Sequence, residues 1–513
     1  MTMRSTVSTT APWTERGGAL SEHAPAMDVL DRIDAACRRV PGRIAHRSED
    51  RTLTYAELRR RSDALAASIV SRLPGDRSPI VVVGHKEPEV LIGLLGVAKS
   101  GVPYVPLDSS LPRARIERTI AAARSGLVLT PERVRELSAG DEPPPPRRRN
   151  GDDPFYVIFT SGSTGDPKGV VITGACLESF VDWMLDEQRF GEDHEVFLNQ
   201  APFSFDLSVM DLYLCLSTGG TLVSVTADEV ASPKRLYRML AACGVTVWVS
   251  TPSFARLCLA ERSFDETMLP ALRRFLFCGE TLPPDVAASL LERFPRAEVW
   301  NTYGPTEATC ATTSVRVDRE LAAREGPLPV GRTKPGTRIL IVGDDGAPAP
   351  AGSRGEIVIA GPNVSVGYLG RADLTTQAFF ELDGIRAYRT GDQGRFEGDM
   401  LYFEGRRDDQ VKLHGYRIEL GDVEANLRGL EGVREAVVLP VLKDGVPDSL
   451  AAFVVLEGGS AGESPTQVAS ALRAALRDRL PVYMLPRRVE LVESLPTNLN
   501  GKIDRRRLAE MLR

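Results

Sequence analysis

The sequence lacks the features that mark several specialised classes of protein. Its seven cysteines include no CxxC pair, which argues against a disulfide framework or a zinc site and favours a reducing, cytoplasmic setting. No apolar run reaches the roughly 18 residues that span a membrane, and residues 1–27 have no apolar core of a secretory signal, so they are expected to be flexible. The net charge is −6, without a large basic block. We therefore expect neither membrane insertion nor nucleic-acid binding.

The 513 residues exceed what one hydrophobic core usually fills, so two or more domains are expected. From about residue 28, helical periodicity alternates with short apolar runs such as PIVVVG (79–84) and FYVIFT (155–160). This alternation is typical of α/β domains with largely parallel sheets. From about 327 to 404, glycines and short β patterns predict a small barrel or a set of hairpins.

The last hundred residues mix apolar strand patterns with a helical pattern at 465–480, which indicates a separate small α+β domain. We therefore predict an α/β (α+β) protein. A large N-terminal domain over 28–407 would hold two α/β sheet subdomains and a small β-barrel. A mobile C-terminal α+β domain would follow over 408–513.

Residues 160–169 read TSGSTGDPKG and follow the strand predicted at 155–160. Backbone N–H groups, hydroxyls and a lysine in such a loop suit bound phosphates. The spacing is not that of a Walker loop. A flexible turn is the common fate of a generic Gly/Ser loop, but this ten-residue string is far more specific.

Further motifs follow along the chain, among them NTYGPTE (301–307), YRTGDQGR (388–395), GRRDDQVKLHGYRIE (405–419) and NGKID (500–504). With the phosphate loop, this ordered set resembles the adenylate-forming superfamily of acyl-CoA synthetases, luciferases and nonribosomal adenylation domains. The resemblance extends from about Leu53 to the C-terminus. It implies a ligase that uses ATP to make an acyl-adenylate and then transfers the acyl group to a thiol.

The resemblance also implies a role for each motif residue. Glu307 would hold Mg²⁺, and Thr306 would contact the reacting carboxylate or the acyl phosphate. Lys502 would offset the repulsion between the substrate carboxylate and ATP, although a lysine without this motif is usually a surface residue. The C-terminal domain would then rotate about Asp408, withdrawing Lys502 and presenting Gly415 to the thiol. The implied ATP and AMP contacts are Thr160, Ser161, Gly162, Ser163, Thr164, Gly165, Lys168, Asn301, Thr302, Tyr303, Gly304, Asp392 and Arg406.

Asp206, in FSFDLS (203–208), indicates which class of carboxylic acid the enzyme would activate. Superfamily members that activate amino acids have an aspartate here, which pairs with the substrate ammonium; a capping aspartate is the alternative. The other implied pocket residues are mostly apolar and without a second charge, so we expect a small cavity for alanine, glycine or serine. They are Leu207, Met210, Val249, Leu276, Cys278, Thr302, Cys310 and Ala311.

Strings around the pocket, such as FLFCGETLP (275–283), resemble the branch of the superfamily that activates D-alanine for a carrier protein. Cys278 falls where that branch has a cysteine beside the substrate α-carbon. Cys310 is a departure, because a valine is expected there. The abundance of Arg, Ala and Pro indicates a high-GC source and natural-product pathways, including antibiotic biosynthesis.

D-Alanine is the preferred substrate on this resemblance, and a separate phosphopantetheinylated carrier protein, acting in trans, is the expected acceptor. A nonribosomal-type enzyme for glycine, L-alanine or serine is a true alternative. An acyl-CoA synthetase is disfavoured by Asp206. A catalytically silent binding protein is disfavoured by Lys502, Glu307 and Asp392.

Overall fold

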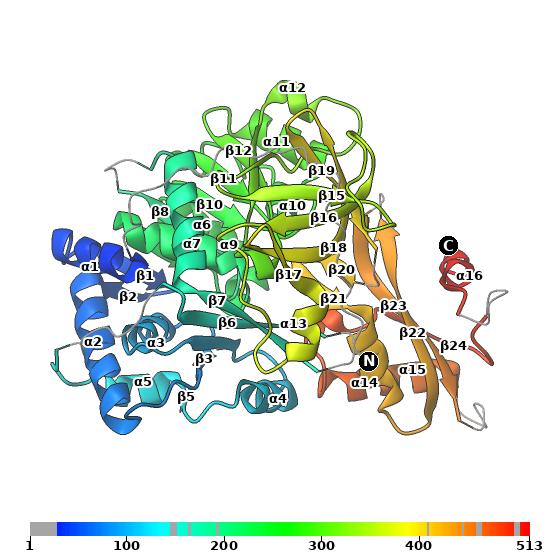
Figure 1. The fold of residues 1–513 in the computed structure, drawn as a ribbon, viewed down its shortest axis with the longest axis horizontal. Helices are drawn as coiled ribbons and strands as arrows, with labels where there is room; N and C mark the ends of the chain where they lie inside the picture. The colour runs from blue at the N-terminus through cyan, green and yellow to red at the C-terminus, as the bar shows by residue number, and fades with distance from the viewer. Residues whose placement is uncertain are drawn as a thin grey trace.

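The protein folds into a large body of three sheets with a smaller unit against one side (Figure 1). This is the mixed α/β and α+β class expected from the sequence. Within the described part, no helix is both long and apolar enough to cross a membrane. The expected flexible segment 1–27 lies outside the description. The computed structural model describes residues 28–512 except 144–150, 163–165, 191–193, 408–409, 444–445, 458–463 and 497–502.

The first sheet has the order β5-β3-β4-β6-β7 and is parallel except for its β6–β7 hairpin, whose turn is the phosphate loop. Both apolar runs predicted above, at 79–84 and 155–160, form strands in it. Thr54 and Glu57 form a capping box that starts the first helix packed here. The elements are α2 (Tyr55–Arg72), β3 (Ile80–Gly84), α3 (Pro88–Lys99), β4 (Tyr104–Asp108), α4 (Arg113–Ala123), β5 (Val128–Leu129), α5 (Pro131–Leu137), β6 (Pro154–Thr160) and β7 (Lys168–Thr173).

The second sheet has nine strands in the order β14-β13-β12-β11-β10-β8-β9-β1-β2, and its central strands are parallel. Helix α7 (Leu207–Thr218) is buried over residues 207–216, in accord with its apolar sequence. The other strands and helices are α1 (Val29–Arg39), β1 (Ile44–Ser48), β2 (Arg51–Thr54), α6 (Gly174–Glu187), β8 (Val196–Asn199), β9 (Thr221–Ser224), α8 (Ala227–Val230), α9 (Pro233–Cys243), β10 (Val247–Ser250), α10 (Pro252–Leu259), β11 (Arg274–Phe277), α11 (Pro284–Arg293), β12 (Glu298–Tyr303), β13 (Thr313–Val317), α12 (Arg319–Ala322) and β14 (Arg332–Thr333).

The third sheet occupies the segment in which a small barrel or hairpins were expected. Its antiparallel strands follow the order β15-β16-β18-β17, and β19 also pairs with β18. Among the described strands the pairing does not close, so hairpins describe this sheet better than a barrel. The elements are β15 (Arg338–Val342), β16 (Gly355–Ala360), α13 (Ala372–Ala378), β17 (Phe379–Leu382), β18 (Ile385–Glu397) and β19 (Met400–Arg406).

The C-terminal unit has a hydrophobic cluster of its own, as a separate domain requires. It begins with a hairpin whose two-residue turn, His414–Gly415, has φ angles of 51° and 86°. Such a turn matches the twist of the flanking strands. The boundary and hinge at Asp408 stay predictions, because residues 408–409 lie outside the description. The elements are β20 (Gln410–Leu413), β21 (Tyr416–Glu419), α14 (Leu420–Arg428), β22 (Val433–Lys443), β23 (Val446–Leu456), α15 (Pro465–Arg477), β24 (Arg488–Leu491) and α16 (Arg505–Glu510).

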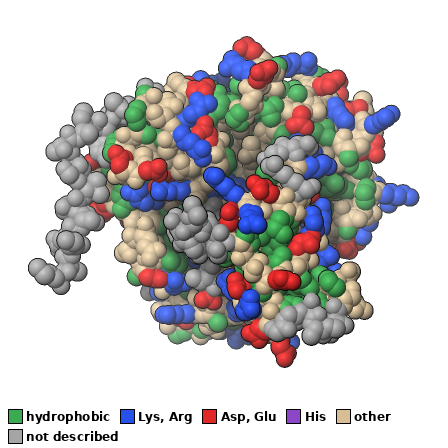
Figure 2. Space-filling view, turned by 90° about the vertical axis from the view of Figure 1, so that its right-hand side faces the viewer, with side chains coloured by type: hydrophobic (Ala, Val, Ile, Leu, Met, Phe, Trp, Pro, Cys, Tyr) green, Lys and Arg blue, Asp and Glu red, His purple; other side chains and the backbone are tan. Residues whose placement is uncertain are grey.

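Polar and aromatic contacts hold the C-terminal unit against the body. Arg115 on α4 forms an ion pair of 3.1 Å with Asp422 on α14, and both side chains are largely buried. Tyr416 lies between Phe205 and Tyr483, with ring centroids 5.3 and 3.6 Å away. Basic and acidic side chains intermix over the side of the molecule shown in Figure 2. The buried ion pair and the stacked rings therefore hold the two units together.

We predict that Arg115→Met weakens the docking of the C-terminal unit by about 2–3 kcal/mol, because it leaves the buried carboxylate of Asp422 without its cation. The rate of tryptic cleavage after the exposed Arg407, which lies between the two units, should rise about tenfold or more. The control is Arg113→Met on the same helix, where the side chain is 92% exposed. Equal cleavage rates for the two variants would contradict the prediction.

Candidate functional site

The phosphate loop connects β6 to β7 as expected, and Thr160, Ser161, Gly162 and Lys168 are within the description. Ser163, Thr164 and Gly165 are outside it. A Cβ atom on Gly162 would lie 2.2 Å from the carbonyl oxygen of Asp166, so only glycine fits there. The Thr160 hydroxyl donates a hydrogen bond of 3.5 Å to the carbonyl of Lys168, across the base of the loop.

Glu307 lies on the short 3₁₀ helix η1 (Thr306–Ala308) that follows β12, and its side chain is fully buried. The Arg417 guanidinium lies 2.6 Å from one carboxylate oxygen, and the Tyr368 hydroxyl donates to the other at 2.8 Å. Burial alone would disfavour the charge, but Arg417, Lys168 and the Tyr368 hydrogen bond together lower the pKa of Glu307 to about 2. The carboxylate is therefore ionised at neutral pH.

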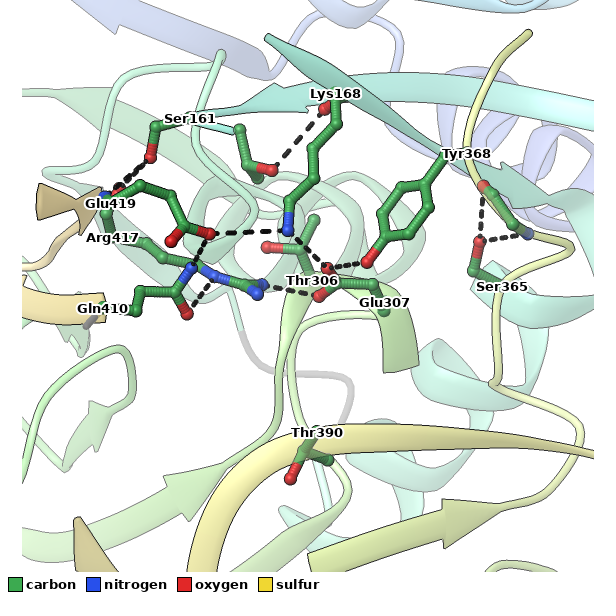
Figure 3. Close-up of polar contacts among 12 residues, drawn as sticks. Ser161, Lys168, Thr306, Glu307, Ser365, Tyr368, Thr390, Gln410, Arg417 and Glu419 are labelled. Atoms are coloured by element: carbon green, nitrogen blue, oxygen red, sulfur yellow. Dashed lines mark hydrogen bonds and ion pairs between the residues drawn. The ribbon is translucent and has the colours of Figure 1, made fainter. Parts of the chain in front are cut away.

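A ring of charged and amide groups surrounds this carboxylate and joins the two domains (Figure 3). Arg417 also donates to Gln410 at 2.7 Å, and Gln410 donates to Glu419. Lys168 lies 3.6 Å from Glu419 and 4.0 Å from Glu307, which completes the ring. Burial and the neighbouring Arg417 lower the pKa of Lys168. Three ring members belong to the β20–β21 hairpin, so the C-terminal unit supplies part of this site.

The predicted adenine and ribose residues form a second polar cluster. The Tyr303 hydroxyl donates to the buried Asp392 at 2.6 Å, and Arg406 donates to the other oxygen of that carboxylate. Lys412 lies 5.6 Å from the centre of the Tyr303 ring. Asn301, two residues before Tyr303 on β12, donates to the carbonyl of Pro329 at 2.8 Å. The fold therefore brings together residues that are nearly one hundred positions apart.

Asp206 stands at the N-terminal end of α7, with its carboxylate facing a cavity. The Thr306 hydroxyl donates to it at 2.6 Å, so Thr306 connects the predicted ammonium contact to the Glu307 turn. Burial raises the pKa of Asp206, while the Thr306 hydrogen bond and the charge of Lys412 act in the opposite direction. A substrate cation placed beside this carboxylate would offset the cost of its burial.

The other residues of the predicted amino-acid pocket lie close to one another. Val249 and Leu276 are direct neighbours on β10 and β11, and the Thr302 hydroxyl donates to the carbonyl of Phe277 at 2.8 Å. The Cys278 thiol donates to the carbonyl of Cys310 at 3.5 Å. The apolar members belong to one hydrophobic cluster and are buried: Leu207, Met210, Val249, Leu276, Cys278, Cys310 and Ala311.

Cys310 and the preceding Thr309 both adopt left-handed backbone conformations, with φ of 68° and 57°. Such strain persists only where the surroundings enforce it. Here the Thr309 hydroxyl donates to the carbonyl of Asn363 at 2.8 Å, and the Asn363 amide donates to the carbonyl of Ala308 at 2.9 Å. Cys310, which stands where a valine was expected, therefore lies on a turn whose backbone conformation these hydrogen bonds fix.

One cavity joins part of the predicted site, and the apolar pocket residues, Glu307, Lys168 and Tyr303 are not among the residues that line it. The predicted residues that line it are Thr160, Ser161, Asp206, Gly304, Thr306, Asp392, Arg406 and Gly415. Lys502 lies outside the described residues, so its position is untested.

Sequence reasoning missed Arg417, Lys412, Glu419 and Tyr368. Arg417 and Glu419 are two residues apart on β21, and Lys412 is the cross-strand partner of Arg417, so a hairpin prediction for KLHGYRIE could have identified these three.

The described residues contain no group of three or more His, Cys, Asp or Glu side chains placed to hold a metal ion. Mg²⁺ commonly takes one or two carboxylates and completes its shell with substrate phosphates and water. Glu307 fits this use, because it is ionised and lies beside Lys168, which begins the strand after the phosphate loop.

Comparisons with known proteins agree with this geometry. The AMP-binding enzyme family model matches residues 33–369, and the AMP-binding enzyme C-terminal domain model matches 422–502. The D-alanine–D-alanyl carrier protein ligases of Bacillus anthracis (strain CDC 684 / NRRL 3495) and Bacillus cereus (strain B4264) are each 46% identical to the chain. These alignments cover 94% of this chain and 99% of each ligase.

Two solved structures have the same fold. The Vibrio cholerae adenylation domain AlmE, in complex with glycyl-adenosine-5'-phosphate, matches with a TM-score of 0.82 at 24% identity, over 96% of this chain and 99% of that one. PA1221, an NRPS protein containing adenylation and PCP domains, matches with a TM-score of 0.77 at 27% identity, over 94% and 97%. Both matches extend over nearly the entire chain.

We predict that Asp206→Asn stabilises the ligand-free protein. Because burial raises the pKa of this carboxyl, its charge costs stability above that pKa, and asparagine still accepts the Thr306 hydrogen bond. The midpoint of thermal unfolding should rise by about 1–3 °C at pH 7, and the gain should shrink as the pH falls through the raised pKa toward the ordinary value of the carboxyl. Asp228→Asn, at a side chain 77% exposed, is the calorimetric control. A midpoint below that of the wild type would refute the prediction.

Proposed function

This chain belongs to the AMP-binding enzyme family, and we propose that it activates D-alanine and transfers it to a carrier protein. The products of the first step would be D-alanyl-AMP and pyrophosphate. The observation that carries the proposal is the carboxylate of Asp206, which faces the cavity 2.6 Å from Thr306, the neighbour of Glu307. An ammonium site thus lies beside the turn that would serve the phosphates.

The pocket supports a small amino acid as the substrate. Met210 and Leu276 are fully buried, and they would occupy the space that a larger substrate side chain would need. Apart from Asp206, the proposed pocket residues carry no ionised side chain, so the substrate side chain would be apolar or weakly polar. The 46% identity to D-alanine–D-alanyl carrier protein ligases supports D-alanine, and Cys278 would lie near its α-carbon. A pocket of this kind separates substrates that differ by one methyl by only about 1–3 kcal/mol.

Each site residue has a role in this proposal. Tyr303 would contact the adenine, while Asp392 and Arg406 would bind the ribose hydroxyls. The phosphate loop from Thr160 to Lys168 would line the path of the phosphates. Glu307 would hold Mg²⁺ together with phosphate oxygens, and the bound ion would offset part of their negative charge.

The two proposed half-reactions use the same cavity. In the first, a carboxylate oxygen of the amino acid attacks the α-phosphorus of ATP, and pyrophosphate leaves. Lys502 would approach at this stage and stabilise the developing charge. In the second, the carrier thiolate attacks the acyl carbonyl carbon, the carbon–oxygen bond to AMP breaks, and AMP leaves with the bonding electrons. A thioester on the carrier phosphopantetheine results.

We propose that rotation of the C-terminal domain about Asp408 separates these stages, with the division between domains at 407/408. Gly415 lines the cavity, and its N–H donates to Glu280 at 2.5 Å. Because Gly415 is the residue that would face the thiol, its position supports assigning this orientation of the C-terminal domain to the thioester-forming stage. The carrier would be a separate protein. The enzyme would act in the cytoplasm, since all seven cysteines are buried free thiols. A place in natural-product or antibiotic biosynthesis belongs to the same proposal.

We predict that amino-acid-dependent exchange of pyrophosphate into ATP is strongest with D-alanine. The panel should include L-alanine, glycine, both serines and larger amino acids, and the next best substrate should be about 10-fold or more poorer in kcat/KM. Asp206→Ala should lower kcat/KM for the amino acid by about 100-fold or more, because it removes the partner of the ammonium. Strong exchange with glycine or L-alanine would instead favour a nonribosomal-type enzyme, and exchange with no amino acid would refute the activity.

We predict that Lys502→Ala affects the two half-reactions unequally. Adenylation should fall about 100-fold or more, because a cation is lost from the transition state. Transfer from preformed D-alanyl-adenylate to the carrier should remain within about threefold of the wild-type rate. Single-turnover assays of each step provide the measurement, with the exposed Lys443→Ala as the control. Equal losses in both steps would contradict the assignment.

A further inference from the structure

Lys86 is a fully buried cation to which the proposed chemistry gives no role. It follows β3, and its ammonium donates to the side-chain oxygen of Asn199 at 2.5 Å and to the carbonyl of Ala201. The ammonium also lies 4.7 Å from the centre of the Phe203 ring. Burial lowers the pKa of Lys86 to about 8, so the side chain is largely charged at pH 7. These three contacts all fall on the segment that leads from β8 to Asp206.

Asn199 extends these contacts to helix α7, on the other side of Asp206. The same amide whose oxygen accepts from Lys86 donates to the carbonyl of Ala201 at 3.1 Å and to the buried carboxylate of Asp211 at 3.0 Å. Asp206 stands midway between Ala201 and Asp211 in the sequence. The turn that carries Asp206 is therefore held at both of its ends by one hydrogen-bonded group.

The contacts of Lys86 also join two sheets. Lys86 follows the end of β3 in the first sheet, which carries the phosphate loop, whereas Asn199 ends β8 in the second sheet. The lysine thus sets the place of the turn relative to that loop. We propose that Lys86 is a positioning residue for the amino-acid site, where it fixes the turn 200–206 and directs the carboxylate of Asp206 toward the substrate ammonium. This inference rests on the proposed function.

Stability of the fold gives no reason for a charge at this position. A buried ammonium carries a desolvation cost, and an apolar side chain of similar length is often tolerated in its place. In Lys86→Met no partner would lose its last hydrogen bond, because Asn199 still accepts from the Ser224 hydroxyl at 2.8 Å and Ala201 still accepts from Asn199. The variant should therefore fold, with a midpoint of thermal unfolding equal to or above that of the wild type.

The first test is the steady-state kinetics of amino-acid-dependent exchange of pyrophosphate into ATP, with the full-length protein. Lys86→Met should raise KM for the best amino-acid substrate about tenfold or more, because Asp206 is no longer held in place, and should leave KM for ATP within about threefold. In an Asp206→Ala background the same change should cost less than about threefold in kcat/KM, since Lys86 acts through Asp206. Lys334→Met is the matched control, because Lys334 is also buried, donates to the Ser179 hydroxyl at 2.8 Å and has its pKa lowered to about 8 by burial. This control should leave both KM values within about threefold.

The second test needs no substrate. Hydrogen exchange measured by mass spectrometry reports on the Phe205 N–H, which donates to the carbonyl of Pro202 at 2.9 Å within the turn. Peptides over 200–208 should exchange about tenfold or more faster in Lys86→Met, and at the wild-type rate in Lys334→Met.

Three results would overturn the proposal: equal rises of the two KM values, a full tenfold loss in the Asp206→Ala background, or hydrogen exchange of the turn at the wild-type rate in Lys86→Met. If Lys86→Met does not fold, Lys86→Gln, which keeps an N–H donor without the charge, is judged by the same criteria. A wild type that exchanges pyrophosphate with no amino acid would refute the proposed function instead. Hydrogen exchange of the turn would then still decide whether Lys86 holds it.

Discussion

A carboxylate that is buried where two domains meet is stable as an anion only if a cation lies beside it. In this protein that carboxylate is Glu307, and its partner Arg417 comes from the other domain. The contact fixes more than charge. It holds the β20–β21 hairpin in the cavity, and it places the backbone of that hairpin against the Ser161 hydroxyl. The phosphate loop, the η1 turn and the C-terminal domain are therefore parts of one electrostatic unit.

Much of the fold follows from local patterns in the sequence. The strands at 80–84 and 154–160 are short apolar runs with sharp ends, and the helix from Tyr55 starts at a capping box. The sheet over 338–406 was harder to predict. Alternating patterns indicate strands but not whether a sheet closes, because closure depends on the pairing of distant edge strands. The division between the domains also stays a prediction, since its residues lie outside the description.

Many residues of the candidate site could be predicted, because each of the ordered motifs indicates particular functional positions. The fold brings Asp206 next to Thr306 and Tyr303 next to Asp392. The partners of Glu307 and Lys168 were missed. Arg417 lies in a motif that was recognised, yet its pairing with Glu307 depends on how one domain docks against the other. No periodicity along the chain encodes that docking. The left-handed turn at Cys310 was also missed, because a cysteine gives no local signal for positive φ.

The two-residue turn at His414 and Gly415 closes the β20–β21 hairpin, and its strands carry no residue of the proposed amino-acid pocket. Under the proposed function, choice of acid and delivery to the thiol would therefore depend on different domains, both of which line the cavity. Substitutions in the pocket wall can accumulate without altering the hairpin. Such a division allows a lineage of these proteins to acquire new substrates while it retains its acceptor, and the reverse is equally open to it.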